Sequence, residues 1–196
     1  MHETIKNLNQ IDKEIKEKIN LLNYQDYMPK IIAVSKTFKL DHISPLINFG
    51  HVHFGENKVQ EAQQKWSEIK EKNKNIKLHM IGKLQTNKVK FAVKIFDFIH
   101  SVDSFKLVKK IAEEQSKINK NIKVFIQVNL GDEAQKSGIQ KNETKNLLDF
   151  AIQSGLEVIG LMCLPPFDDE SEKYFKELRE LNSKLSLNDI SMGMSH

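Results

Sequence analysis

Residues 31–38 read IIAVSKTF, a run of four apolar side chains followed directly by Ser35 and Lys36. Four apolar residues in a row predict a buried β-strand. Lysine is among the side chains that are least often buried without a partner. The stretch therefore predicts a strand whose end carries an amine, and the rest of the chain must supply a reason for placing it there.

Short apolar runs of the same kind recur along the chain, with helical stretches between them. Strands that alternate with helices indicate parallel pairing through βαβ units. The predicted strands cover residues 31–34, 51–54, 77–81, 95–99, 123–128, 157–161 and 189–191. Helices are predicted around residues 59–69, 104–112, 147–152 and 174–185, the second with Ser104 as its N-cap. A leading helix is predicted over residues 1–22, where apolar side chains recur at steps of three and four.

Two α/β folds fit this order of elements. One is a (β/α)8 TIM-barrel-like fold that lacks its last unit, and the other is an open doubly wound sheet. No linker rich in Pro, Gly or Ser divides the chain. Residues 1–196 are therefore predicted to form a single domain, with the helix at 1–22 followed by βα repeats over 31–196.

The composition bounds the function classes. The net charge is +4, but Arg179 is the single arginine among 30 basic residues, and base readout relies on arginine, so no nucleic-acid partner is expected. No apolar run approaches the ~20 residues of a membrane helix, and the start of the chain does not have the apolar core of a secretory signal. Cys163 is the only cysteine, which excludes an internal disulfide and a multi-cysteine metal site. A reducing cytoplasm is the expected compartment.

Polar or glycine residues follow each predicted strand, where the chemistry of a (β/α)8 barrel gathers. Lys36 is the first of them. An amine attacks a carbonyl only when it is neutral, and partial burial favours the neutral form. Such a lysine can form a Schiff base with an aldehyde. The alternative is a lysine that extends into solvent at the rim, or one that pairs with Glu56 or Asp103.

Seven motifs occur in the order seen in one protein family. They are AVSKT (33–37), FGENKVQE (54–61), HMIGKLQTNK (79–88), HSVDS (100–104), IQVNLGDEAQKSGI (126–139), GLMCLPP (160–166) and SMGMS (191–195). In these motifs the chain resembles the pyridoxal-phosphate homeostasis protein family. The resemblance implies a barrel of the alanine racemase N-terminal type that binds pyridoxal 5′-phosphate (PLP). It also implies a role in cellular vitamin B6 and amino-acid balance without enzymatic turnover.

The resemblance assigns roles to single residues. Lys36 matches the lysine that holds PLP as a Schiff base, Asn57 matches a residue that lies against the cofactor, and Ser195 matches a phosphate ligand. His79 and Ser101 fall at positions that line the pocket, although a buried His79 that satisfies a backbone partner is the simpler interpretation. No catalytic or metal-binding residue is expected.

Gly82 and Gly193 fall within the same motifs. Either glycine can permit a close backbone approach or can serve a turn. Cys163 is expected to fill the core.

The chain departs from the family at its end, because members continue past SMGMS through a helix to a final strand, whereas this sequence stops at His196. That strand supplies an arginine near the pyridine nitrogen and a Gly-Thr pair at the phosphate. Without it we expect an absent eighth strand, weaker phosphate anchoring and an open barrel edge. A monomer is expected, or a dimer if the open edge pairs.

Two other functions are open at this point. A PLP-dependent racemase or decarboxylase needs a second catalytic group, commonly a tyrosine, but Tyr24, Tyr27 and Tyr174 lie away from the predicted strand ends. A truncated remnant or scaffold with weak or no PLP binding is the other alternative.

Overall fold

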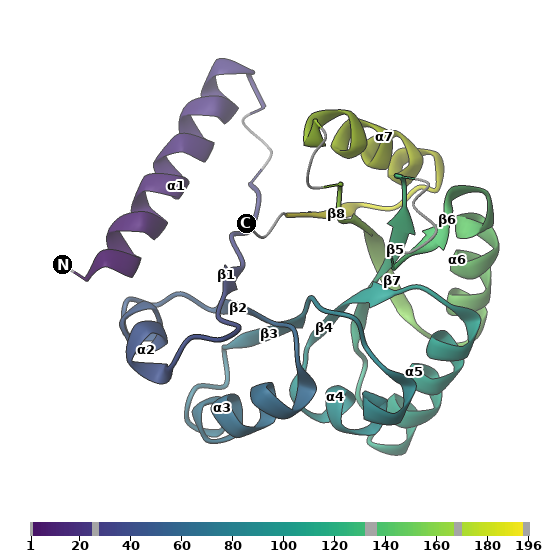
Figure 1. Ribbon diagram of the computed structural model, residues 1–196, viewed down its shortest axis with the longest axis horizontal. Helices are drawn as coiled ribbons and strands as arrows, with labels where there is room; N and C mark the ends of the chain where they lie inside the picture. Colours follow the sequence, from purple (N-terminus) through teal and green to yellow (C-terminus); the bar gives the residue numbers. More distant parts are fainter. Residues whose placement is uncertain (1, 25–27, 132–136, 167–169, 194–196) are drawn as a thin grey trace.

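The computed structural model describes residues 2–24, 28–131, 137–166 and 170–193 (Figure 1). Its strands pair in the order β1-β2-β3-β4-β5-β7-β8, with β6 beside β5, and every pair is parallel. The strands are β1 (Ala33–Val34), β2 (His53–Glu56), β3 (Lys77–Met80), β4 (Phe98–Val102), β5 (Lys123–Asn129), β6 (Ile139–Gln140), β7 (Glu157–Cys163) and β8 (Asp189–Met192). The helices are α1 (Glu3–Leu21), α2 (Leu40–Asn48), α3 (Val59–Lys72), α4 (Val89–Ile95), α5 (Phe105–Lys117), α6 (Thr144–Gln153) and α7 (Ser171–Lys184).

The sheet curves into a half-barrel with α2 to α7 on its outer side (Figure 1). This arrangement confirms the TIM-barrel-like prediction. The doubly wound alternative is wrong, because that fold places helices on both faces of the sheet. In the described part of the chain no strand pairs β8 with β1, so the sheet is open there.

The core lies between the outer face of the sheet and the helices. Its fully buried side chains include Phe54, Leu78, Ile99, Val124 and Leu161 from strands, and Trp66, Val108, Leu147 and Leu178 from helices. The rings of Phe54 and Trp66 are 4.8 Å apart between centroids. Each such side chain contributes about 1.5–3 kcal/mol to stability by its removal from water.

The predicted elements agree with the structure in most places, and Ser104 accepts a hydrogen bond from Leu107 N at 3.4 Å as the N-cap of α5. The first strand is shorter than predicted, and the expectation that it is buried is wrong. Val34 is 45% exposed because β1 is an edge strand that pairs only with β2. Helices α2 and α4 and the two-residue strand β6 were not expected from the sequence.

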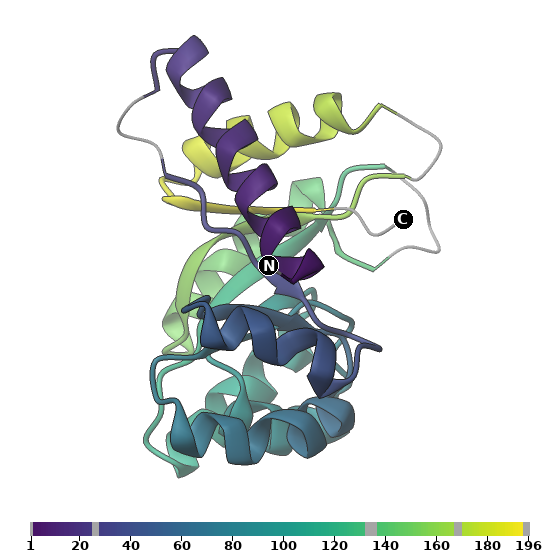
Figure 2. The same cartoon turned by 90° about the vertical axis from the view of Figure 1, so that its left-hand side faces the viewer.

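Helix α1 lies to one side of the half-barrel, next to α2 (Figure 2). None of its described side chains is fully buried, although they form the expected apolar stripe. Two expectations remain predictions. One is that the natural protein lacks the final barrel strand, which would come after the strand labelled β8 here, and the other is that it is a monomer.

Asn182 of α7 binds both β7 and the turn that precedes β8. Its side chain is buried; Oδ1 accepts a hydrogen bond from Leu161 N of β7 at 3.0 Å, and Nδ2 donates one to Leu187 O at 2.8 Å. One amide therefore fixes the helix α7 between β7 and the turn that leads into β8.

We expect Asn182→Ala to lower the free energy of unfolding by about 2–4 kcal/mol, because it leaves two backbone groups without these bonds. Urea unfolding measures the change. The exposed Asn188 serves as a control, and Asn188→Ala should stay within about 0.5 kcal/mol of the unchanged protein. Equal effects of the two substitutions would contradict the role of Asn182.

Candidate functional site

Lys36 is the second residue after β1 and is partly buried. The ladder extends one residue past β1, since Ser35 N donates to Gly55 O at 2.9 Å. The next residue, Thr37, has a φ of 65°, which turns the chain away immediately after the lysine. Lys36 therefore stands at the end of the strand, as its position in the sequence predicts.

The Lys36 amine has no hydrogen bond or ion pair with any other residue of the described ranges. The alternative in which it pairs with Glu56 is wrong for this structure, because the Glu56 carboxylate accepts from Lys65 Nζ at 2.9 Å instead. The amine is therefore not held by either of the acids that the sequence suggested. Its role as the attachment point for a cofactor stays a prediction.

Asn57 follows β2 at the same edge of the sheet. Its side-chain oxygen Oδ1 is buried and has no hydrogen-bond partner among the described residues. The backbone of Asn57 packs against Gly82, which follows β3; a Cβ at residue 82 would lie 2.6 Å from Asn57 O. Gly82 therefore serves a close backbone approach, one of the two roles considered for it.

Ser101 and His100 share a bulge in β4. Ile99 pairs with Val124 and Val102 with Ile126, so His100 and Ser101 together face the single residue between these partners, Phe125. A bulge redirects side chains and is frequent beside functional sites. Here the centroids of the stacked His100 and Phe125 rings are 4.4 Å apart, and Ser101 Oγ is buried with no partner in the described part of the chain.

The unpartnered atoms Asn57 Oδ1 and Ser101 Oγ fit a polar ligand at this edge of the sheet. Buried polar atoms in native proteins almost always have a partner, so each exception needs an explanation. An amide oxygen, a hydroxyl and a free amine suit a small ligand that carries an aldehyde and polar substituents. PLP has this chemistry. Ser195, the predicted phosphate ligand, lies outside the described residues.

A chain of hydrogen-bonded histidines crosses the interior of the half-barrel. His53 Nδ1 lies 3.0 Å from His79 Nε2, His79 Nδ1 lies 2.9 Å from His100 Nε2, and His100 Nδ1 lies 2.7 Å from Ser191 Oγ. The expected backbone partner of His79 is therefore wrong, since two other imidazoles bind it. The His100–Ser191 bond connects β4 with β8 across the interior.

The imidazoles of His53, His79 and His100 are neutral at neutral pH. Burial lowers the pKa of His79 to about 2, with a further effect of His100 and His53, and burial lowers the pKa of His100 to about 3. A neutral imidazole has one donor and one acceptor nitrogen. The donors can therefore all point from His53 toward Ser191, or all point the opposite way. In both arrangements His79 and His100 each donate one of these bonds and accept one.

The buried histidines predict a loss of stability in acid. In the unfolded chain a histidine binds a proton near pH 6.5, whereas folded His79 and His100 bind one only near pH 2–3. Their contribution is thus complete above pH 6.5 and is lost as the pH falls toward 3. From pH 6.5 to 4.5 the two groups together should lower the free energy of unfolding by roughly 5 kcal/mol.

Urea unfolding between pH 6.5 and 4.5 tests this prediction. His79→Gln should make the free energy of unfolding fall less steeply with decreasing pH, by the slope that corresponds to about one bound proton. If His79→Gln unfolds with the same pH dependence as the unchanged protein, His79 does not have a lowered pKa.

We expect Gly82→Ala to cost about 1–3 kcal/mol of stability, because the added methyl group meets the Asn57 backbone and forces one strand end to shift. Gly193→Ala is the control, since no described atom lies within 4 Å of a Cβ at that position. Thermal unfolding of both variants measures the difference. A neutral Gly82→Ala would mean that this approach is looser than the structure indicates.

Other candidate groups lie away from this edge. Burial raises the pKa of the Cys163 thiol to about 12, so Cys163 fills the core, as expected, and is not a nucleophile at neutral pH. Arg179 is exposed on α7. Among the described residues no cluster of His, Cys, Asp and Glu could hold a metal ion. None of the helices in the described ranges has the length and apolar character needed to cross a membrane.

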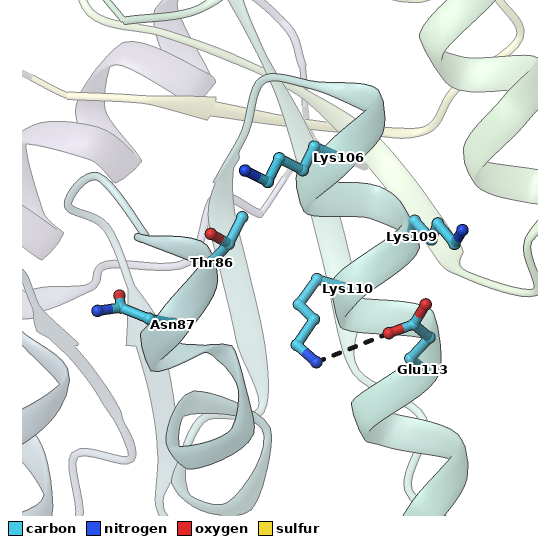
Figure 3. A pocket seen from close by; sticks show the side chains of 6 residues that line it. All are labelled: Thr86, Asn87, Lys106, Lys109, Lys110 and Glu113. Atoms are coloured by element: carbon cyan, nitrogen blue, oxygen red, sulfur yellow. Dashed lines mark ion pairs between the residues drawn. The ribbon is translucent and has the colours of Figure 1, made fainter.

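A separate groove lies on the outer wall, between α5 and the 3-10 turn Thr86–Lys88 (Figure 3). Thr86 and Asn87 line one side, and Lys106, Lys109, Lys110 and Glu113 line the other. Lys110 already forms ion pairs with Glu113 at 3.6 Å and Glu114 at 2.8 Å. The groove contains none of the predicted site residues.

Known proteins resemble this chain over most of its length. Residues 7–196 match the family model of the alanine racemase N-terminal domain. The chain is 36% identical over 177 residues to the pyridoxal phosphate homeostasis protein of Aquifex aeolicus, covering 85% of this chain and 77% of the relative. It is 34% identical over 203 residues to the protein of that name from Pasteurella multocida, with coverages of 96% and 86%.

Solved structures show the same fold. PipY of Synechococcus elongatus, in a structure with PLP bound, superposes with a TM-score of 0.77 at 32% identity, covering 89% of this chain and 87% of PipY. An alanine racemase of Clostridium difficile superposes with a TM-score of 0.61 at 15% identity, covering 90% of this chain and 49% of the racemase. At that identity the racemase supports the fold alone.

Proposed function

Because the chain belongs to the pyridoxal phosphate homeostasis protein family, we propose that it binds PLP and takes part in vitamin B6 homeostasis. The observation that carries the proposal is the amine of Lys36, which pairs with none of the described residues and lies at the same sheet edge as the Asn57 oxygen that has no described partner. The aldehyde of PLP condenses with a neutral amine and releases water, and the bond reverses by hydrolysis.

The residues of the chain have distinct parts in this proposal. Lys36 provides the amine for a reversible Schiff base, Asn57 and Ser101 provide polar contacts, and Ser195 binds the phosphate. Gly82 keeps Asn57 in place. The histidine chain forms a neutral, hydrogen-bonded layer in the barrel interior, and its link to Ser191 fixes the strand that leads to Ser195.

The proposed role is to hold and release PLP rather than to turn over amino acids. A racemase needs an acid or base on the face of the cofactor opposite the lysine. Of the two described tyrosines, Tyr174 is buried against the helix–sheet core, and Tyr24 lies in the turn after α1. Neither belongs to a strand end. We propose that the protein acts in the cytoplasm, as a monomer unless the open sheet edge pairs.

Binding of PLP to Lys36 can be tested by trapping. After incubation with PLP and reduction with borohydride, mass spectrometry of the digested protein should locate the cofactor on Lys36. Lys36→Ala should trap none at this position, whereas Lys39→Ala, at an exposed lysine three residues away, should trap as much as the unchanged protein. Trapping spread over many surface lysines would contradict a specific site.

Thermal unfolding with and without PLP separates a cofactor-binding protein from a remnant. At 100 times its Kd, PLP should raise the free energy of unfolding by about 2.7 kcal/mol. The rise should be much smaller in Lys36→Ala. Exchange of the α-hydrogen of an added amino acid for solvent deuterium at catalytic rates would overturn the non-enzymatic role.

A further inference from the structure

Lys65 of α3 contacts the loop that carries Lys36. Its ammonium donates to Ser35 O at 2.8 Å, to Glu56 Oε1 at 2.9 Å and to Glu61 Oε1 at 3.3 Å. An ammonium has three N–H donors, so these contacts use all of them. The Lys65 side chain is 11% exposed and the Glu56 side chain is fully buried, so the cluster is shielded from water on the side of Glu56.

The two acids bound by Lys65 also hold the residues on either side of Lys36. Ser35 Oγ donates to Glu56 Oε1 at 2.8 Å, and Thr37 N donates to Glu61 Oε1 at 2.9 Å. The Thr37 N–H is the main reason that the pKa of Glu61 lies below its ordinary value, with Lys65 as a second cause. Lys36 thus lies between two anchored residues.

Thr37 adopts a conformation that needs such an anchor. A φ of 65° is left-handed and unfavourable for a β-branched residue. Such strain persists where the surrounding structure determines it, and it is often found at functional sites. The bond from Thr37 N to Glu61 lies at this strained residue.

Charged side chains from several elements surround the loop of residues 35–37. Glu56 faces it from β2, Glu61 and Lys65 face it from α3, Lys58 precedes α3 and acts on Glu61, and Lys39 follows in the loop itself. Glu56 is fully buried, and Lys65 is its cationic partner. Without Lys65 the two acids lose the cation that they share, and the bonds by which they hold Ser35 and Thr37 are weakened.

We propose that Lys65 is a positioning residue for Lys36. It binds Glu56 and Glu61 in one cluster, so that the two acids fix residues 35–37 and, with them, the place from which the Lys36 side chain extends. The consequence for PLP rests on the proposed function, but the cluster and its effect on the amine do not require PLP.

Lys65→Met tests the proposal, with Lys70→Met as the matched control. Lys70 also lies on α3 and binds one acid and one carbonyl group, Asp97 Oδ2 at 2.5 Å and Ile95 O at 2.7 Å, but neither is in the 35–37 loop. Both substitutions remove one partly buried lysine charge from the same helix. A general loss of stability therefore affects both variants, whereas an effect on Lys36 is specific to Lys65.

The first measurement is acetylation of Lys36 by acetic anhydride across a range of pH, quantified by mass spectrometry without PLP. In Lys65→Met the reaction at neutral pH should be several-fold faster than in the unchanged protein, because a less firmly held loop exposes the partly buried Lys36 amine to the reagent. Lys70→Met should react like the unchanged protein.

The second measurement is hydrogen exchange of the Thr37 amide. It should be faster in Lys65→Met and in Glu61→Ala than in Lys70→Met. Glu61→Ala provides the test if Lys65→Met does not fold, because the Glu61 side chain is 29% exposed and its loss leaves the Lys65–Glu56 pair intact. Unchanged Thr37 exchange in Glu61→Ala, or unchanged Lys36 acetylation in a folded Lys65→Met, would overturn the proposal.

A trapping experiment with PLP separates the two proposals. If the unchanged protein traps no PLP but acetylation and exchange change as stated, the proposed function fails and the positioning role stands. If PLP is trapped equally well by the unchanged protein and by Lys65→Met, with unchanged acetylation of Lys36, the function stands and the positioning role fails.

Discussion

Parallel pairing of neighbouring strands is the constraint on which the site depends. Every strand pair in the described sheet is parallel, so β1 to β4 all end at the same edge. Residues that are far apart in the sequence, such as Lys36, Asn57 and Ser101, therefore gather there. Pairing also explains why β1 can be only two residues long, since the Ser35 N–H continues the ladder toward Lys36.

The sequence predicted the elements whose apolar pattern is regular, and it failed where two rules compete. Helix α2 contains Pro45, which is unfavourable inside a helix. Helix α4 reads VKFAVKI, and four of its seven residues are buried. In so short an apolar run a helix and a strand give the same pattern. The β4 bulge cannot be seen in the sequence either, because it depends on the pairing of Val102 with Ile126. It is the bulge that brings His100 and Ser101 to face a single partner.

The candidate residues were predicted from motifs, but their partners were not. The sequence offered Glu56 as a partner for Lys36, whereas the structure gives it to Lys65, nine residues further along the chain on α3. This choice depends on how α3 packs against β2, which composition and spacing do not encode. The sequence did not predict the histidine chain, for the same reason. His53, His79 and His100 come from three different strands and meet only in the folded sheet.

The hydrogen bond between Trp66 Nε1 and Glu56 Oε1, at 2.9 Å, gives the protein an internal optical reporter. Trp66 is the single tryptophan of the chain and is fully buried, so its fluorescence comes from one well-defined environment. The indole donates to the same carboxylate oxygen that binds Ser35 Oγ, one residue before Lys36. Emission from this ring therefore registers the charge and position of that carboxylate, and stopped-flow fluorimetry can follow events at the loop in real time without an added dye.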